Sequence, residues 1–366
     1  MKVSKNIIRF KKTKYFLVLL FIGILVGFLY AFLHKKTYRI VAKSMSPTLQ
    51  VGDILMAKPF SDLSQIKRGD ILIFKYPQNI KVIYAKRCVA FGGDQILYAD
   101  KTLYIRFREG DAYMKKNFQA DQIVTFGGKI WVKNPYFYKY PGIHYDQSVN
   151  IFQQMGLYMN INQLAMQPAL VAELPKKPGL VYNAFYTKVP KNKYFMIGDN
   201  RDHSNDSRFW GSIPAQDIVG YAYFANGEST EQHIRDRRKE LIQTKLAKNK
   251  DLPLMLNNNL QSVKYTSSNS NEITLYLKYP YYTKNDILKN FKDEQDFIKS
   301  FSDNEKSGTC ALLFSNKNNN VQSYLLSGIK IHEIFLSKNN IELITILIDK
   351  ESCSPYLYHQ TFSKDN

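Results

Sequence analysis

A long uncharged apolar stretch near the N-terminus constrains this chain more than any other feature. Residues 16–33 read FLVLLFIGILVGFLYAFL, without a charged side chain. At about 1.5 Å per residue, a helix of this length spans roughly 27 Å, close to the thickness of a bilayer core. The sequence therefore predicts a single transmembrane anchor over residues 15–34 and the lipid bilayer as a partner.

Charges flank this stretch unevenly. Only basic charged residues precede it, namely Lys2, Lys5, Arg9, Lys11, Lys12 and Lys14. Because an excess of lysine and arginine marks the cytoplasmic side of a span, we expect residues 1–14 to be a cytoplasmic tail and the C-terminal bulk to be exported. A cleaved signal peptide is the alternative, but His34-Lys35-Lys36 lacks the small residues of a cleavage site. This favours a retained anchor.

The net charge is +20, from 51 Lys and Arg against 31 Asp and Glu. Such a charge suits nucleic acid or an anionic membrane surface. Beyond the N-terminal tail the basic residues are dispersed, and no zinc-finger spacing, phosphate-binding glycine loop or long basic helix is present. We therefore expect no nucleic-acid partner, no metal and no cofactor.

The pattern of residues 35–226 predicts short β-strands separated by turns. Asp53–Ala57 and Asp70–Tyr76 are apolar runs that each follow a glycine, and Lys81–Ala90 is a third. Strands of this length at close intervals predict a largely antiparallel β domain. Residues from about 95 to 192, rich in tyrosine and punctuated by proline and glycine, are expected to be an insertion in it.

The character of the chain changes near Gly227, and we expect a C-terminal α+β extension of unknown role over residues 227–366. Its charged segment 232–249 predicts a helix or linker, and apolar spacing from Ile287 to Phe301 predicts one amphipathic helix. Strands are expected at Leu275–Tyr279, Ala311–Phe314, Tyr324–Phe335 and Ile341–Ile348.

Three cysteines are present, Cys88, Cys310 and Cys353. An exported domain permits disulfides, so Cys310 and Cys353 either pair or stay as two buried thiols. Cys88 is expected to be a small buried residue without a catalytic role.

A serine and a lysine after the anchor suggest nucleophilic chemistry. A serine is a useful nucleophile only when a neighbouring group takes its proton, and no histidine here has a convincing catalytic context. A lysine can replace histidine when burial lowers its pKa. Ser44 lies just outside the apolar stretch and Lys86 lies in an apolar run. Taken alone, the first is typical of a turn and the second of a strand edge.

A third segment changes this interpretation. Gly198–Gly211 is dense in charged and hydroxyl residues and follows the apolar run Tyr194–Ile197, which predicts a buried polar network. A calcium loop is excluded because Arg201 interrupts its aspartates and the required glycine and terminal glutamate are missing. A purely structural salt-bridge network around Arg201 or Arg208 is the other interpretation.

Four segments in this order, behind the anchor, resemble bacterial type I signal peptidase, a family of serine–lysine proteases. They are Ser-Met-x-Pro-Thr-Leu at Ser44–Leu49, Arg-Gly-Asp-Ile…Phe at Arg68–Phe74, Lys-Arg…Gly-Asp at Lys86–Asp94, and Gly-Asp-Asn-Arg-Asp-x-Ser-x-Asp-Ser-Arg at Gly198–Arg208. The resemblance covers about residues 14–225. It implies a mainly β fold, in which an antiparallel β catalytic domain follows one transmembrane helix and precedes the α+β extension.

The resemblance also implies an acyl-enzyme mechanism with Ser44 as nucleophile and Lys86 as general base. Ser204 matches the serine that holds the lysine amine in place. The residues expected to support this loop are Asp199, Arg201, Asp206 and Arg208, the last two as an ion pair. The protein would then lie in the bacterial inner membrane, with its catalytic domain on the exported side.

Substrates implied by the resemblance are exported preproteins, whose signal peptides carry small residues at the first and third positions before the cut. Such a segment is expected to bind as an added strand beside Ile40–Lys43 and Ile83–Ala85. The residues expected to bind it are Ile40, Ala42, Met45, Leu49, Tyr84 and Ala85.

Two of these positions depart from the family pattern. Ala42 replaces a serine or glycine, and because alanine has no hydroxyl the oxyanion hole must use backbone N–H groups or water, or be weaker. Ala85 replaces isoleucine or valine, which predicts a wider pocket and relaxed specificity. Two other functions stay open. One is a specialised peptidase that matures a single secretion or conjugation substrate, and the other is a non-catalytic membrane-anchored binding protein that retains the fold.

Overall fold

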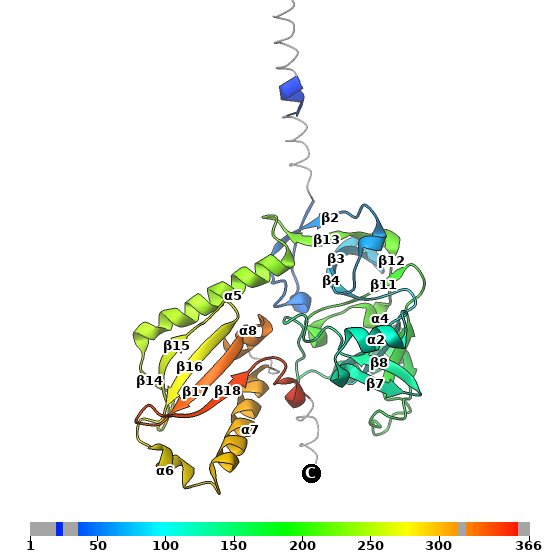
Figure 1. Cartoon of the computed structure of the whole chain (residues 1–366). Helices are drawn as coiled ribbons and strands as arrows, with labels where there is room; N and C mark the ends of the chain where they lie inside the picture. Colours follow the sequence, from blue (N-terminus) through cyan, green and yellow to red (C-terminus); the bar gives the residue numbers. More distant parts are fainter. Residues whose placement is uncertain (1–19, 25–35, 314–319, 358–366) are drawn as a thin grey trace, which may run out of the picture.

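The computed structural model describes residues 20–24, 36–313 and 320–357 (Figure 1). The first of these ranges is a short helical segment. The predicted cytoplasmic tail lies outside the described residues, as does the predicted anchor apart from residues 20–24. Within the described ranges, no helix is both long and apolar enough to cross a bilayer.

The first sheet has seven antiparallel strands and lies at the upper right in Figure 1. In spatial order they are β1 (Thr37–Arg39), β2 (Ile54–Lys58), β13 (Ile218–Phe224), β3 (Ile71–Tyr76), β4 (Asn79–Phe91), β11 (Lys193–Ile197) and β12 (Ile213–Pro214). The three apolar runs predicted as strands correspond to β2, β3 and β4. The turns before β2 and β3 require glycine because Gly52 and Gly69 have φ angles of 102° and 103°.

Between β4 and β11 the chain forms a second, six-stranded antiparallel sheet. Its order is β7 (Ile123–Phe126), β8 (Lys129–Lys133), β6 (Thr102–Arg106), β5 (Gln95–Ala99), β10 (Ala184–Lys188) and β9 (Gln167–Ala169). The helices of this part are α2 (Asp111–Asn117) and α3 (Ile151–Asn160), and α4 (Ser207–Trp210) follows β11. The protein is thus mainly β with antiparallel sheets, as predicted.

The third sheet, at the left in Figure 1, is formed by β14 (Leu254–Met255), β15 (Gln261–Thr266), β16 (Glu272–Lys278), β17 (Lys330–Leu336) and β18 (Glu342–Ile348). Strands β16 and β17 are parallel, and a parallel pair needs a long crossover. The helices α6 (Lys284–Leu288), α7 (Glu294–Leu313) and α8 (Asn320–Leu326) supply it. Helix α5 (Thr230–Ala247) joins this sheet to the first one.

Three predictions for this part are wrong in detail. The single amphipathic helix expected from Ile287 to Phe301 is two helices, because Asp293 caps a new helix by accepting a hydrogen bond from the Asp296 backbone. The strand expected at Ala311–Phe314 is the last turn of α7 as far as Leu313. The strand expected from Tyr324 begins only with β17, because Tyr324 still belongs to helix α8, which ends at Leu326.

Short 3-10 turns connect these elements: η1 (Lys43–Met45), η2 (Leu63–Gln65), η3 (Ala120–Gln122), η4 (Arg201–His203), η5 (Ala215–Asp217), η6 (Lys248–Asp251) and η7 (Ser354–Leu357). One continuous hydrophobic core joins the second and third sheets, since Ile96 and Ile105 belong to the same buried cluster as Phe335 and Ile346. The C-terminal part therefore packs firmly against the rest of the protein.

Candidate active site

Ser44 is placed by a 3-10 turn that is fixed at two apolar points. Met45 and Leu49 are 1% and 0% exposed and pack against strands β2, β3 and β13 of the first sheet. The Leu49 backbone N–H donates to the Met45 carbonyl at 2.9 Å. Burial of these two side chains leaves Ser44 half-buried between them and the exposed residue Ala42.

Lys86 reaches Ser44 from strand β4. It lies opposite Leu72 of β3 and is only 4% exposed, and its Nζ donates to Ser44 Oγ at 2.5 Å. Burial lowers the pKa of Lys86 to about 8, against smaller opposing effects of the Asp206 and Asp199 charges. The two residues that the sequence paired are therefore brought into contact, with the lysine in a dry environment.

Arg87 points to the other face of β4, since side chains alternate along a strand. Its guanidinium forms a bidentate ion pair with the buried Asp199, with contacts of 2.7 and 2.5 Å. Asp199 also accepts a 2.6 Å hydrogen bond from Thr48 Oγ1. Arg87 holds the pKa of Asp199 below its usual range, although burial alone would raise it. The predicted support role of Asp199 thus has a partner, Arg87, that the sequence did not single out.

The Gly198–Arg208 segment lies directly against the Ser44 turn. The Asn200 backbone N–H donates to the Ser44 carbonyl at 3.1 Å, and Asn200 Nδ2 donates to the Lys43 carbonyl at 3.3 Å. A Cβ at Gly198 would collide with the Ser44 carbonyl and with Ser204. Only glycine therefore allows this close approach.

Asp206 and Arg208 form the expected ion pair. Both are fully buried, and Arg208 Nε and Nη2 each lie 2.9 Å from an Asp206 carboxylate oxygen. Arg208 Nη2 also donates to the Arg201 carbonyl at 2.5 Å. Arg201 itself is buried, and its Nε has no hydrogen-bond partner among the described residues.

Ser204 is buried beside Gly198, but it does not bond to Lys86 in this structure. Its Oγ is without a hydrogen-bond partner in the part of the chain that is described. The hydroxyl predicted to hold the lysine thus lies near the site on the side of Asp206, where it helps to lower the pKa of that carboxyl.

The residues predicted to bind substrate surround an unpaired strand edge. Strand β11 pairs with β4 only from Arg87 to Phe91, so residues 83–85 are paired by β3 alone. Ile40, Met45, Leu49 and Ala85 belong to one apolar cluster, whereas Tyr84 packs in a neighbouring one. The side of β4 away from β3 is therefore unpaired at residues 83–85.

A family model described as signal peptidase, peptidase S26, matches residues 12–226, more than half of the chain. This protein belongs to the peptidase S26 family. Signal peptidase I from Helicobacter pylori (strain ATCC 700392 / 26695) is 34% identical over 233 residues, covering 55% of this chain and 78% of that protein. Signal peptidase I from Aquifex aeolicus (strain VF5) is 34% identical over 212 residues, covering 51% and 74%. The type II secretion pilotin AspS from Vibrio cholerae is 18% identical with a TM-score of 0.26, covering 34% of this chain and all of that one, too weak a likeness to establish a shared fold.

The protein is accordingly a signal peptidase hydrolase, and its family acts on exported preproteins that bear signal peptides. Around the site, this signal peptidase uses residues that sequence reasoning missed. Lys101 Nζ lies 2.8 Å from a carboxylate oxygen of buried Asp202, and the Tyr140 ring stacks under Arg87 at 3.9 Å. Only the contacts of Arg87 had a signal in the sequence. Arg87 directly follows Lys86 in an apolar run, and a buried charge requires a partner.

Proposed function

We propose that this signal peptidase is a membrane-anchored serine endopeptidase with Ser44 as nucleophile and Lys86 as general base. The observation that carries the proposal is the 2.5 Å separation of Lys86 Nζ and Ser44 Oγ, with the lysine buried. A pKa of about 8 leaves a useful fraction of the amine neutral near neutral pH, and only the neutral amine can accept a proton.

The cycle follows from this pair. Ser44 Oγ attacks the scissile carbonyl while Lys86 takes its proton, and the protonated amine then passes that proton to the departing amino group of the mature protein. The signal peptide stays bound to Ser44 as an ester. Lys86, neutral again, activates a water molecule that hydrolyses the ester and releases the signal peptide as a carboxylate. The Ser44 backbone N–H is one oxyanion donor, and Ala42 supplies no hydroxyl as a second.

Four charged residues support this chemistry without taking part in it. The ion pair of Asp206 and Arg208 shapes the loop that carries Ser204, and the Ser204 hydroxyl is assigned to hold the Lys86 amine when substrate enters. Asp199, with Arg201 beside it, fixes the opposite side of the Ser44 turn.

The substrate is an extended signal peptide that adds a strand to the free edge of β4 at Ile83–Ala85, against Ile40–Lys43. The other contacts are assigned to Ala42 and Tyr84, and Met45 and Leu49, which are 1% and 0% exposed, are assigned to the buried layer beneath the peptide. Residues 15–34 would anchor the protein in the bacterial inner membrane, with residues 1–14 cytoplasmic and residues 35–226 catalytic on the exported side. Residues 227–366 form the extension.

The test is cleavage of a preprotein by the purified full chain in detergent. Ser44→Ala and Lys86→Ala are each expected to abolish cleavage. Lys81→Ala is the matched control, since Lys81 is an exposed lysine on the same strand. Cleavage that survives either active-site substitution would defeat the serine–lysine assignment. If the wild type cleaved no preprotein, the binding-protein alternative would be favoured.

A further inference from the structure

The residues after 226 contact the segment that carries Ser44. From helix α5, Arg237 Nη1 donates to the Pro47 carbonyl at 2.6 Å. Pro47 lies between Met45 and Leu49, the two buried points that fix the Ser44 turn. A cation of the C-terminal extension thus holds the backbone of this turn directly.

A second basic side chain of the extension is buried against the catalytic part. Lys350 follows strand β18 and is 8% exposed, and its Nζ donates to the carbonyls of Phe137, Tyr140 and Pro141 at 2.6, 3.1 and 3.0 Å. The same amine lies 4.0 Å from the centre of the Phe137 ring. Three carbonyls around one amine fix the conformation of this loop, because the loss of the amine would remove the hydrogen bond that it donates to the buried Phe137 carbonyl.

The loop held by Lys350 leads back to the active site. The Tyr140 ring stacks under the guanidinium of Arg87, and Arg87 holds Asp199. Asp199 in turn accepts from Thr48 of the Ser44 segment, and a Cβ at Gly142 would overlap the Thr48 side chain. Each step is a direct contact between buried or half-buried groups.

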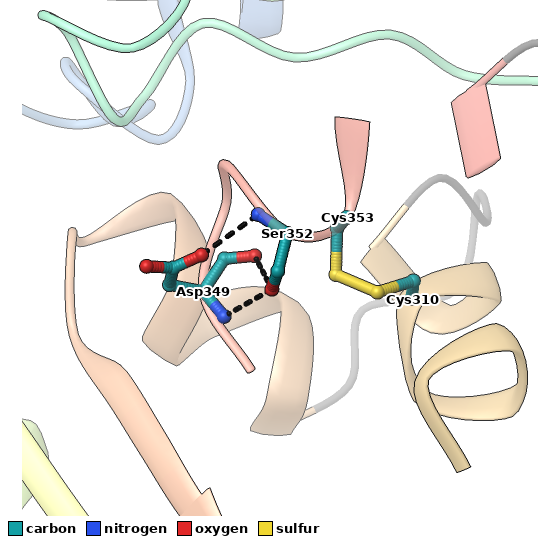
Figure 2. Close-up of a disulfide and its surroundings, with 4 residues drawn as sticks. All are labelled: Cys310, Asp349, Ser352 and Cys353. Carbon is teal, nitrogen blue, oxygen red and sulfur yellow. Dashed lines mark hydrogen bonds between the residues drawn. A yellow bond between two sulfur atoms is a disulfide. The ribbon is translucent and has the colours of Figure 1, made fainter. Parts of the chain in front are cut away.

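The turn at Asp349–Ser352, which includes Lys350, is closed by its own hydrogen bonds (Figure 2). The Asp349 backbone N–H donates to Ser352 Oγ at 3.0 Å, and the Ser352 backbone N–H donates to the Asp349 carboxylate at 2.8 Å. Next to this turn, Cys353 forms a disulfide with Cys310 of helix α7. The turn that contains Lys350 is therefore linked to helix α7 of the extension by a disulfide.

We propose that the extension positions the nucleophile, with Arg237 and Lys350 as the positioning residues that transmit its fold to the Ser44 turn. This inference rests on the proposed function, since it concerns the geometry of the Ser44–Lys86 pair. It gives residues 227–357 a role in the peptidase reaction itself. Neither residue touches the reacting atoms.

The experiment compares the full-length wild type with Arg237→Met, Lys350→Met and the double variant, on a signal-peptide substrate. Arg235→Met is the matched control, because Arg235 lies on the same helix and donates to Gln232 of that helix. We expect kcat to fall about ten- to a hundredfold with KM unchanged, since small misplacements of reacting groups have effects of this size. The pH midpoint of kcat/KM is expected to stay where it is, because Lys86 remains buried. Arg237→Lys is expected to restore part of kcat.

Melting temperature is measured for every variant. A lower melting temperature with kcat equal to that of Arg235→Met would overturn the proposal, because the contacts would then be merely structural. If Lys350→Met fails to fold, Arg237→Met and Arg237→Lys decide alone, with the same readouts. Ser44→Ala is run in parallel: cleavage that survives it defeats the proposed function, whereas a normal kcat in Arg237→Met defeats only the positioning role.

Discussion

The pH dependence of cleavage provides the sharpest test of the proposed base. With a pKa of about 8 for Lys86, about one molecule in eleven carries the neutral amine at pH 7, against about one in three thousand for a lysine at 10.5. Burial therefore raises the active fraction at pH 7 by about 300-fold. We expect kcat/KM to rise about tenfold per pH unit below 8 and to level off above it, since the base acts only when deprotonated.

The assay is the initial rate of peptide cleavage from pH 3 to 11 at substrate concentrations well below KM, which reports the free enzyme. Lys86→Arg is expected to be inactive throughout, because its guanidinium stays protonated. A midpoint near 10.5 would show that burial does not tune the lysine and would refute the reasoning. A midpoint near 4 would point instead to His144, whose pKa burial lowers to about 4.

Three further changes test the surroundings of the pair. Asp199→Asn leaves the buried guanidinium of Arg87 without its charge partner and is expected to lower the free energy of unfolding by about 3–5 kcal/mol, measured by urea denaturation; a change near zero would contradict a desolvated pair. Ala42→Ser supplies the missing hydroxyl and is expected to raise kcat about tenfold or more. An unchanged kcat would mean that other donors already stabilise the oxyanion. Ala85→Ile is expected to narrow the choice of residues at the first and third positions before the cut, read from a peptide library; an unaltered preference would remove Ala85 from the pocket.

Much of the active site could be predicted because its motifs are local. Ser44 and Lys86 each lie in a short segment whose residue types are set by the chemistry, and the family resemblance carried by these segments implied that the two residues meet. The partner of Asp199 could not be predicted in the same way. Arg87 is 112 positions away, and only the register of β4 shows that it faces Asp199 while Lys86 faces Ser44.

The extension was harder to predict because short apolar runs fit strands and buried helices equally well. The run at Ala311–Leu313 is apolar on its own, yet it closes a twenty-residue helix. The run from Tyr324 is divided at Gly328, whose φ of 79° ends helix α8 before β17 begins. Tertiary packing, absent from the local pattern, decides the first case, and the backbone conformation of Gly328 decides the second.

The contact of Lys350 with the Phe137 loop has a consequence for how the enzyme is made. These residues are 213 positions apart, and synthesis at ~5–20 residues per second takes about 10–40 s to cover that length. The proposed nucleophile Ser44 is translated early, whereas Lys350 is translated long afterwards. On the proposed positioning role, a nascent chain would carry Ser44 and Lys86 before it carries their support, and full peptidase activity would begin only when the third sheet has folded.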